Sequence, residues 1–74
     1  MFVIRIKIKY RWDETYIIPK PSLYDAMQYA FECAKTRCMC SGFPETYEEF
    51  IWKCNDDSSG YSIDVLSQSA QLMI

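Results

Sequence analysis

The first twelve residues alternate between apolar and charged side chains. Apolar residues occupy the even positions from Phe2 to Trp12, and most of the odd positions are basic. A period of two is typical of a β-strand with one buried and one solvated face. The alternation therefore predicts a strand over residues 1–12, whose buried side chains include Phe2, Tyr10 and Trp12.

A hairpin is expected next. Asp13 and Glu14 have side chains that favour turns, and residues 15–18 (Thr-Tyr-Ile-Ile) favour β structure. Pro19 and Pro21 end this run because proline cannot continue a strand ladder. We therefore expect two antiparallel strands with their turn at Asp13 and Glu14.

Ser22 and Asp25 have the spacing of a helix N-cap and its capping partner. Gly42 stands where a residue with a positive φ would end the helix. Helical spacing in between predicts a helix from Leu23 to Ser41. The expected core stripe of this helix consists of Leu23, Ala26, Met27, Ala30, Phe31, Ala34 and Cys38.

Thr46 and Glu49 repeat the capping pattern, and a second, short helix is expected after them. Its apolar face would carry Tyr47, Phe50, Ile51 and Cys54. The segment 50–54 also fits a strand that pairs with the next apolar segment across the loop 55–60, so this alternative stays open.

A third strand is predicted where Tyr61, Ile63 and Val65 alternate with polar residues. The chain then ends in an apolar tail, Leu72, Met73 and Ile74, which could form an edge strand or dock on a neighbouring molecule. The order strand, strand, helix, helix, strand predicts a single α+β domain over residues 1–74. Its sheet would be small and antiparallel or mixed, with the first strand in the middle and the helices packed on one face.

The amino-acid composition excludes most kinds of catalytic site. The chain has 74 residues and no histidine, which excludes Ser-His and Cys-His nucleophile pairs and imidazole metal sites. The four cysteines, Cys33, Cys38, Cys40 and Cys54, lack the two close pairs of a structural zinc site. No apolar run has the length of a signal segment or a membrane span. We therefore expect a cytoplasmic protein with reduced thiols and neither metal, cofactor nor enzymatic activity.

The formal net charge of −2 is unevenly distributed. Residues 1–11 contain four basic and no acidic residues, whereas residues 12–74 contain four basic and ten acidic ones. The basic residues could contact a phosphate backbone or an acidic protein, or they could form an ordinary solvated face partly neutralised by Asp64. They are Arg5, Lys7, Lys9 and Arg11.

Several side chains are candidates for contact with a protein partner. Trp52 projects away from the apolar face of the second predicted helix, so it is either a binding anchor or folds onto the loop after Gly42. Tyr24 and Tyr29 likewise leave the core stripe of the first helix. The acidic residues beside these aromatics are Glu45, Glu48, Glu49, Asp56 and Asp57.

In size, acidity and its strand-strand-helix opening, the chain resembles the small inhibitor proteins of phages and mobile elements, such as anti-CRISPR proteins and blockers of host polymerase. The resemblance implies a stoichiometric inhibitor that occupies a surface of a larger host protein, with the acidic side imitating nucleic acid. The alternative is a nucleic-acid-binding protein that uses the basic face, with Tyr16 or Tyr61 available for stacking. A homodimer formed through the apolar tail is a third hypothesis.

Overall fold

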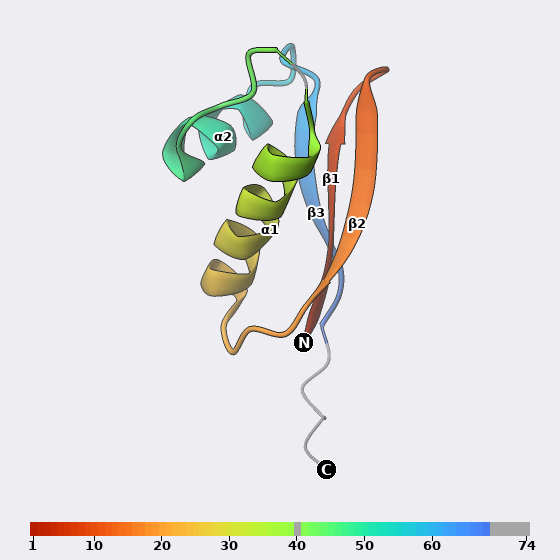
Figure 1. The fold of residues 1–74 in the computed structure, drawn as a ribbon, viewed down its shortest axis with the longest axis vertical. Helices are drawn as coiled ribbons and strands as arrows, with labels where there is room; N and C mark the ends of the chain where they lie inside the picture. The colour runs from red at the N-terminus through yellow and green to blue at the C-terminus, as the bar shows by residue number, and fades with distance from the viewer. Residues whose placement is uncertain (40, 69–74) are drawn as a thin grey trace.

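Five elements make up the computed structural model, which describes residues 1–39 and 41–68. They are β1 (Phe2–Ile8), β2 (Trp12–Ile18), α1 (Leu23–Arg37), α2 (Tyr47–Cys54) and β3 (Tyr61–Gln68) (Figure 1). The predicted order of elements is confirmed. Residues 47–54 are helical, so the alternative of a strand over 50–54 was wrong.

The three strands form one antiparallel sheet in the order β2-β1-β3. The first strand is therefore central, as predicted, and its last residue Ile8 pairs with Trp12 on one side and Tyr61 on the other. Both helices lie on one face of the sheet, and the other face has no helix over it (Figure 1). This arrangement confirms the α+β class with helices packed on one side.

Alternation along β1 builds the core. Its even-numbered side chains, Phe2, Ile4, Ile6 and Ile8, are buried. Above them α1 places three alanines, Ala26, Ala30 and Ala34, one helical turn apart and fully buried. Because an alanine side chain is a single methyl group, the helix axis can approach the isoleucines closely without leaving voids.

An aromatic cluster fixes α2 to the rest of the fold. The rings of Phe31 and Phe50 lie 5.2 Å apart between centroids, and Phe43 packs 5.9 Å from Phe31 and 6.0 Å from Phe50. Tyr61 closes the cluster from β3, at 5.9 Å from Phe43. Rings at these separations add favourable contact energy to the burial of their area.

The hairpin turn lies earlier than predicted, at residues 9–11. The Arg11 N–H donates to the Ile8 carbonyl at 2.9 Å, and Tyr10 takes a φ of +65°. Tyr10 is 93% exposed, so its assignment to the core was wrong. Asp13 and Glu14 belong to β2, where their carboxylates bind Arg5 and Arg37. These cross-element partners favour the strand over a turn at that position.

Helix α1 also ends four residues before the predicted Ser41. Cys38 takes an extended backbone after the last turn, and its N–H donates to the Ala34 carbonyl at 2.7 Å. Its thiol is buried, as expected. Gly42 does have a positive φ of +84°, but in the connection to α2 rather than at the helix end. This early exit lets the connection place Phe43 in the aromatic cluster.

Two residues on predicted apolar faces, one in α1 and one in β3, are exposed in the structure. Leu23 is exposed at the start of α1. Strand β3 continues past Val65 to Gln68, with a register shift opposite Val3 and Ile4, and Val65 is exposed. The predictions for Cys40 and for the apolar tail at residues 72–74 lie outside the described residues.

Candidate protein interaction site

The start of α2 holds one acidic side chain in place, that of Glu49. The Thr46 hydroxyl accepts a hydrogen bond from the Glu49 N–H at 3.2 Å, and the Glu49 carboxylate accepts one from the Glu45 N–H at 3.1 Å. The first bond satisfies a backbone donor that a helix start leaves without a partner, and the second ties Glu49 to the residue before the N-cap. The positive end of the helix dipole also favours carboxylates there. The capping pattern found in the sequence is thus confirmed.

Trp52 lies on the outer side of α2. It follows the fully buried Phe50 by two positions, which corresponds to about 200° around a helix. Its side chain is 79% exposed. The loop after Gly42 does not cover it, so the sideways-folded interpretation was wrong. The role of Trp52 as a binding anchor stays a prediction.

A shallow hollow of about 310 Å³ runs beside Trp52, between α2 and the connection that precedes it. Phe43 and Pro44 provide apolar wall, and Pro44 is itself buried. The polar wall comes from Glu45, Glu49, Lys53 and Asp56. Four of the predicted contact residues therefore come together here: Trp52, Glu45, Glu49 and Asp56.

The hollow carries a net negative charge. Three carboxylates and one ammonium group line it, and this ammonium group, on Lys53, lies 5.4 Å from the Tyr61 ring centre. Hydrogen bonds from the Ser58 hydroxyl and N–H lower the pKa of Asp56, so this carboxylate stays ionised. Lys35 approaches Glu45 from α1 at 3.7 Å. Glu48 and Asp57 are exposed and extend the acidic rim without lining the hollow.

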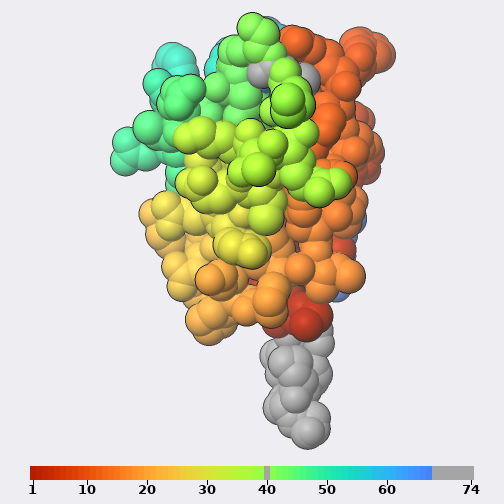
Figure 2. Space-filling model, in the orientation of Figure 1, coloured from red at the N-terminus to blue at the C-terminus, as the bar shows by residue number. Residues whose placement is uncertain are grey.

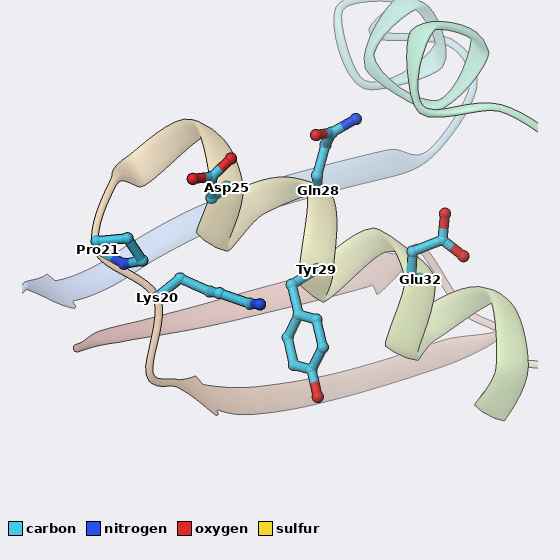
Figure 3. Close-up of a pocket in the computed structure, with 6 residues that line it drawn as sticks. All are labelled: Lys20, Pro21, Asp25, Gln28, Tyr29 and Glu32. Atoms are coloured by element: carbon cyan, nitrogen blue, oxygen red, sulfur yellow. The ribbon is translucent and has the colours of Figure 1, made fainter.

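The two tyrosines of α1 are separated in space. Tyr24 packs edge-on against Tyr47 at 5.8 Å and so faces α2. Tyr29 follows five residues later, about 140° further around the helix. It lines a second hollow, of about 540 Å³, with Lys20, Pro21, Asp25, Gln28 and Glu32 (Figure 3). Tyr29 is therefore not part of the Trp52 site.

Within the described residues, one member of the predicted basic face, Arg5, is paired with acidic residues. Arg5 and Lys7 lie on the uncovered side of β1, and Arg5 donates two hydrogen bonds to Asp13 at 2.9 and 2.5 Å. These bonds hold the pKa of Asp13 below its usual value. Asp64 of β3 pairs with Arg5 on the other side. Lys9 and Arg11 lie in the hairpin turn instead of on the strand.

Neither tyrosine proposed for stacking is presented to a base. The Tyr16 hydroxyl donates to Glu14 at 2.9 Å, and its half-buried ring packs against the core. Burial also raises the pKa of Tyr16. Tyr61 belongs to the aromatic cluster. The sheet face is therefore a poor surface for nucleic acid.

The cysteines that the structure describes have the environment of packing residues. Cys38 is buried, and Cys33 and Cys54 are half-buried. Burial raises the pKa of Cys54 to about 11 and also raises that of Cys33. A thiol with a raised pKa is a weak nucleophile at neutral pH. Within residues 1–39 and 41–68, no group of three His, Cys, Asp or Glu side chains could hold a metal ion.

Sequence reasoning missed the walls of the Trp52 hollow. Phe43 and Pro44 were not among the predicted contact residues, yet Phe43 joins the aromatic cluster and both residues line the hollow. An aromatic residue followed by proline between two helices was the available signal, because such a pair is stiff and apolar.

Comparisons with known proteins leave the family of this chain open. No protein-family model matches it, and there is no match among curated proteins or solved structures. None of the helices in the described part of the chain is long and apolar enough to cross a membrane. Function must therefore follow from the chemistry of the surface.

Proposed function

We propose that the chain is a non-enzymatic protein–protein interaction module, a small stoichiometric inhibitor that blocks a surface of a larger host protein. The observation that carries this proposal is Trp52, which is 79% exposed and stands in a hollow of net negative charge. Tryptophan is among the residues most enriched at the energetic centres of protein interfaces. An exposed tryptophan gains the free energy of burial only when a partner covers it.

The charge around Trp52 favours a basic partner. An arginine or lysine side chain entering the hollow could lie on the indole face while it donates hydrogen bonds to Glu45, Glu49 or Asp56. Such complementarity steers association and selects the correct partner. A host protein with a basic groove, as in proteins that handle nucleic acid, has this chemistry, and occupation of the groove would inhibit it.

The fold presents the site in a rigid form. Phe50, directly behind Trp52 on α2, is fully buried against Phe31 and Phe43. The first turn of the helix is capped by Thr46. Little conformational entropy is then lost when a partner binds, which favours affinity.

Affinity capture from the native host, followed by titration of the captured protein, tests the proposal. The wild-type chain should bind its partner at a ratio of one to one and inhibit it. Trp52→Ala should weaken binding by about 2 kcal/mol or more, since it removes the central anchor. Its melting temperature should hardly change, because exposed substitutions stay within about 0.5 kcal/mol.

Matched variants separate this site from the rest of the surface. Tyr29→Ala removes an exposed aromatic ring outside the hollow and should leave capture unchanged. Glu45→Gln should weaken capture, whereas Glu32→Gln, on α1 outside the hollow, should not. Equal capture by wild type and Trp52→Ala would contradict the proposal, as would turnover of a small molecule by the purified chain.

A further inference from the structure

The tip of the β1–β2 hairpin is a second, distinct surface. Residues 9–11 connect the two strands at one end of the sheet, and in Figure 1 this connection and α2 lie on opposite sides of the view. The connection projects from the body of the molecule at the upper right of Figure 2. The hairpin tip is defined here as Lys9, Tyr10 and Arg11.

Tyr10 holds a conformation that its side chain disfavours. Its φ of +65° lies in the left-handed region, and no other non-glycine residue in the described part of the chain has a positive φ. Glycine or asparagine usually occupies such a turn position, because a Cβ crowds the neighbouring carbonyl there. Strained residues cluster at functional sites, so a tyrosine here calls for an explanation.

The tip is held in place by backbone hydrogen bonds on both sides of Tyr10. The Arg11 N–H donates to the Ile8 carbonyl and the Lys9 N–H to the Gly60 carbonyl, each at 2.9 Å. Gly60 allows this approach because a Cβ there would lie only 3.3 Å from the Lys9 Cβ. The backbone on either side of Tyr10 is therefore held in place, while the ring itself is exposed to solvent.

Positive charge surrounds this ring. The Lys9 Nζ lies 5.2 Å from its centre, and Lys7 and Arg11 line a shallow hollow of about 320 Å³ with Tyr10 and Trp12. The one carboxylate of that hollow, Asp13, is already bound to Arg5. Within the described residues, Lys7, Lys9 and Arg11 form no salt bridge. Their charges are available to a ligand.

We propose that the hairpin tip binds single-stranded nucleic acid. A base stacks on Tyr10, and Lys7, Lys9 and Arg11 contact the phosphates on either side of it. Exposed aromatic rings within a basic surface are the usual means of binding single strands without sequence preference. Every nucleotide supplies both a phosphate for these charges and a flat base for Tyr10, whereas the carboxylates of an acidic peptide would use the charges alone, so the observations favour nucleic acid. The inference goes beyond the Trp52 site and does not depend on it.

Binding is measured in a Trp52→Phe background. This change removes the anchor of the other proposal and leaves Trp12, which lines the hollow beside the hairpin tip, as the only tryptophan. The probe is a fluorescently labelled oligothymidine of about ten nucleotides, within the range that one small domain covers. We expect saturable binding at low salt, seen both in the anisotropy of the label and in the emission of Trp12.

Substitutions of Tyr10 separate stacking from folding. Tyr10→Phe should bind normally, while Tyr10→Gly should bind at least about tenfold more weakly because the stacking ring is gone. Glycine accepts the positive φ, so the melting temperature of Tyr10→Gly should be equal to or above that of the parent chain. A loss of binding in this variant therefore cannot come from unfolding.

Charge variants and a competitor complete the test. Lys9→Gln and Arg11→Gln should each reduce the slope of log affinity against log salt by about 0.7, whereas Lys20→Gln, at the other end of the sheet, should not. Unchanged affinity in Tyr10→Gly would overturn the proposal. Equally tight binding of an oligoglutamate peptide would also overturn it and would assign the tip to an acidic protein surface. An equal reduction of the salt slope in Lys20→Gln would also overturn the proposal, because binding would then depend only on the overall charge of the chain.

Discussion

The Glu14 carboxylate on β2 receives two hydrogen bonds from the Arg37 guanidinium in the last turn of α1, at 2.5 and 2.9 Å. The Tyr16 hydroxyl donates a third, at 2.9 Å. The pair connects an edge strand to the end of the helix that covers the sheet. It lies at the position where the sequence suggested a turn, and it shows how a distant partner changes the role of a charged residue.

The Glu14–Arg37 pair should make stability depend on pH. The hydrogen bonds from Arg37 are the main reason that the pKa of Glu14 lies below its ordinary value of 4.5. A carboxylate with a lowered folded-state pKa stabilises the fold above its unfolded-state pKa, and this contribution disappears as the pH falls through the folded-state value. We expect Glu14→Gln to melt at a lower temperature than wild type at pH 7.

Thermal melts between pH 7 and pH 2 measure this contribution. The difference between wild type and Glu14→Gln should shrink below pH 4.5 and vanish once Glu14 is protonated in both states. Glu32→Gln, an exposed change on α1, should show no such convergence. If the difference in melting temperature were the same at every pH, the ionised carboxylate of Glu14 would contribute nothing to stability.

The two glycines should differ in their tolerance of a side chain. Both have a φ of +84°, so either substitution by alanine is disfavoured by about 1 kcal/mol or more. A Cβ at Gly42 meets nothing within 4 Å, whereas one at Gly60 would press on Lys9. Urea unfolding should therefore show a larger loss for Gly60→Ala than for Gly42→Ala. Equal losses of unfolding free energy in the two variants would show that Lys9 moves away from the new Cβ at position 60 without cost.

Close packing of α1 on the sheet should make Ala30 intolerant of larger side chains. The residue is fully buried above the isoleucines of β1. Ala30→Leu should lower the free energy of unfolding by about 1–3 kcal/mol, because added methylenes have no space in a dense core. Glu32→Leu, on the exposed side of the same helix, should change it by less than about 0.5 kcal/mol. Chemical denaturation of both variants compares the two positions directly.

Cys54 should react slowly with alkylating reagents. Burial raises the pKa of its thiol to about 11, and the thiolate fraction falls about tenfold for each pH unit below that value. Labelling with iodoacetamide at pH 8, followed by mass spectrometry of peptides, should show Cys54 mostly unmodified in the native chain and modified once the chain is unfolded. Rapid native labelling of Cys54 would contradict the described burial.

Local patterns predicted the elements because their causes lie within a few residues. Alternation in residues 2–8 and helical spacing after Ser22 each depend on side chains that are neighbours in sequence. The caps are equally local: Ser22 accepts from the Asp25 N–H, and Thr46 from the Glu49 N–H. Helical geometry also placed Trp52 off the apolar face of α2, whereas its exposure was decided by the structure.

Contacts between distant segments could not be predicted in this way. The turn falls on Tyr10 because Asp13 and Glu14 have partners on other elements. Likewise, Phe43 becomes part of the core only once α2 folds back over β3.

The amino-acid sequence by itself determined the order of the elements and the central strand, and it favoured a second helix while leaving a strand over 50–54 and the exposure of Trp52 open. Only the tertiary structure decided that Glu45, Glu49 and Asp56 share a hollow with Trp52 while Tyr29 lies elsewhere, and that Tyr10 stands exposed between Lys9 and Arg11. The physical reason is the distance along the chain over which each interaction acts. Periodicity and capping act between neighbours along the chain, whereas a site is assembled from segments that meet only when the core packs.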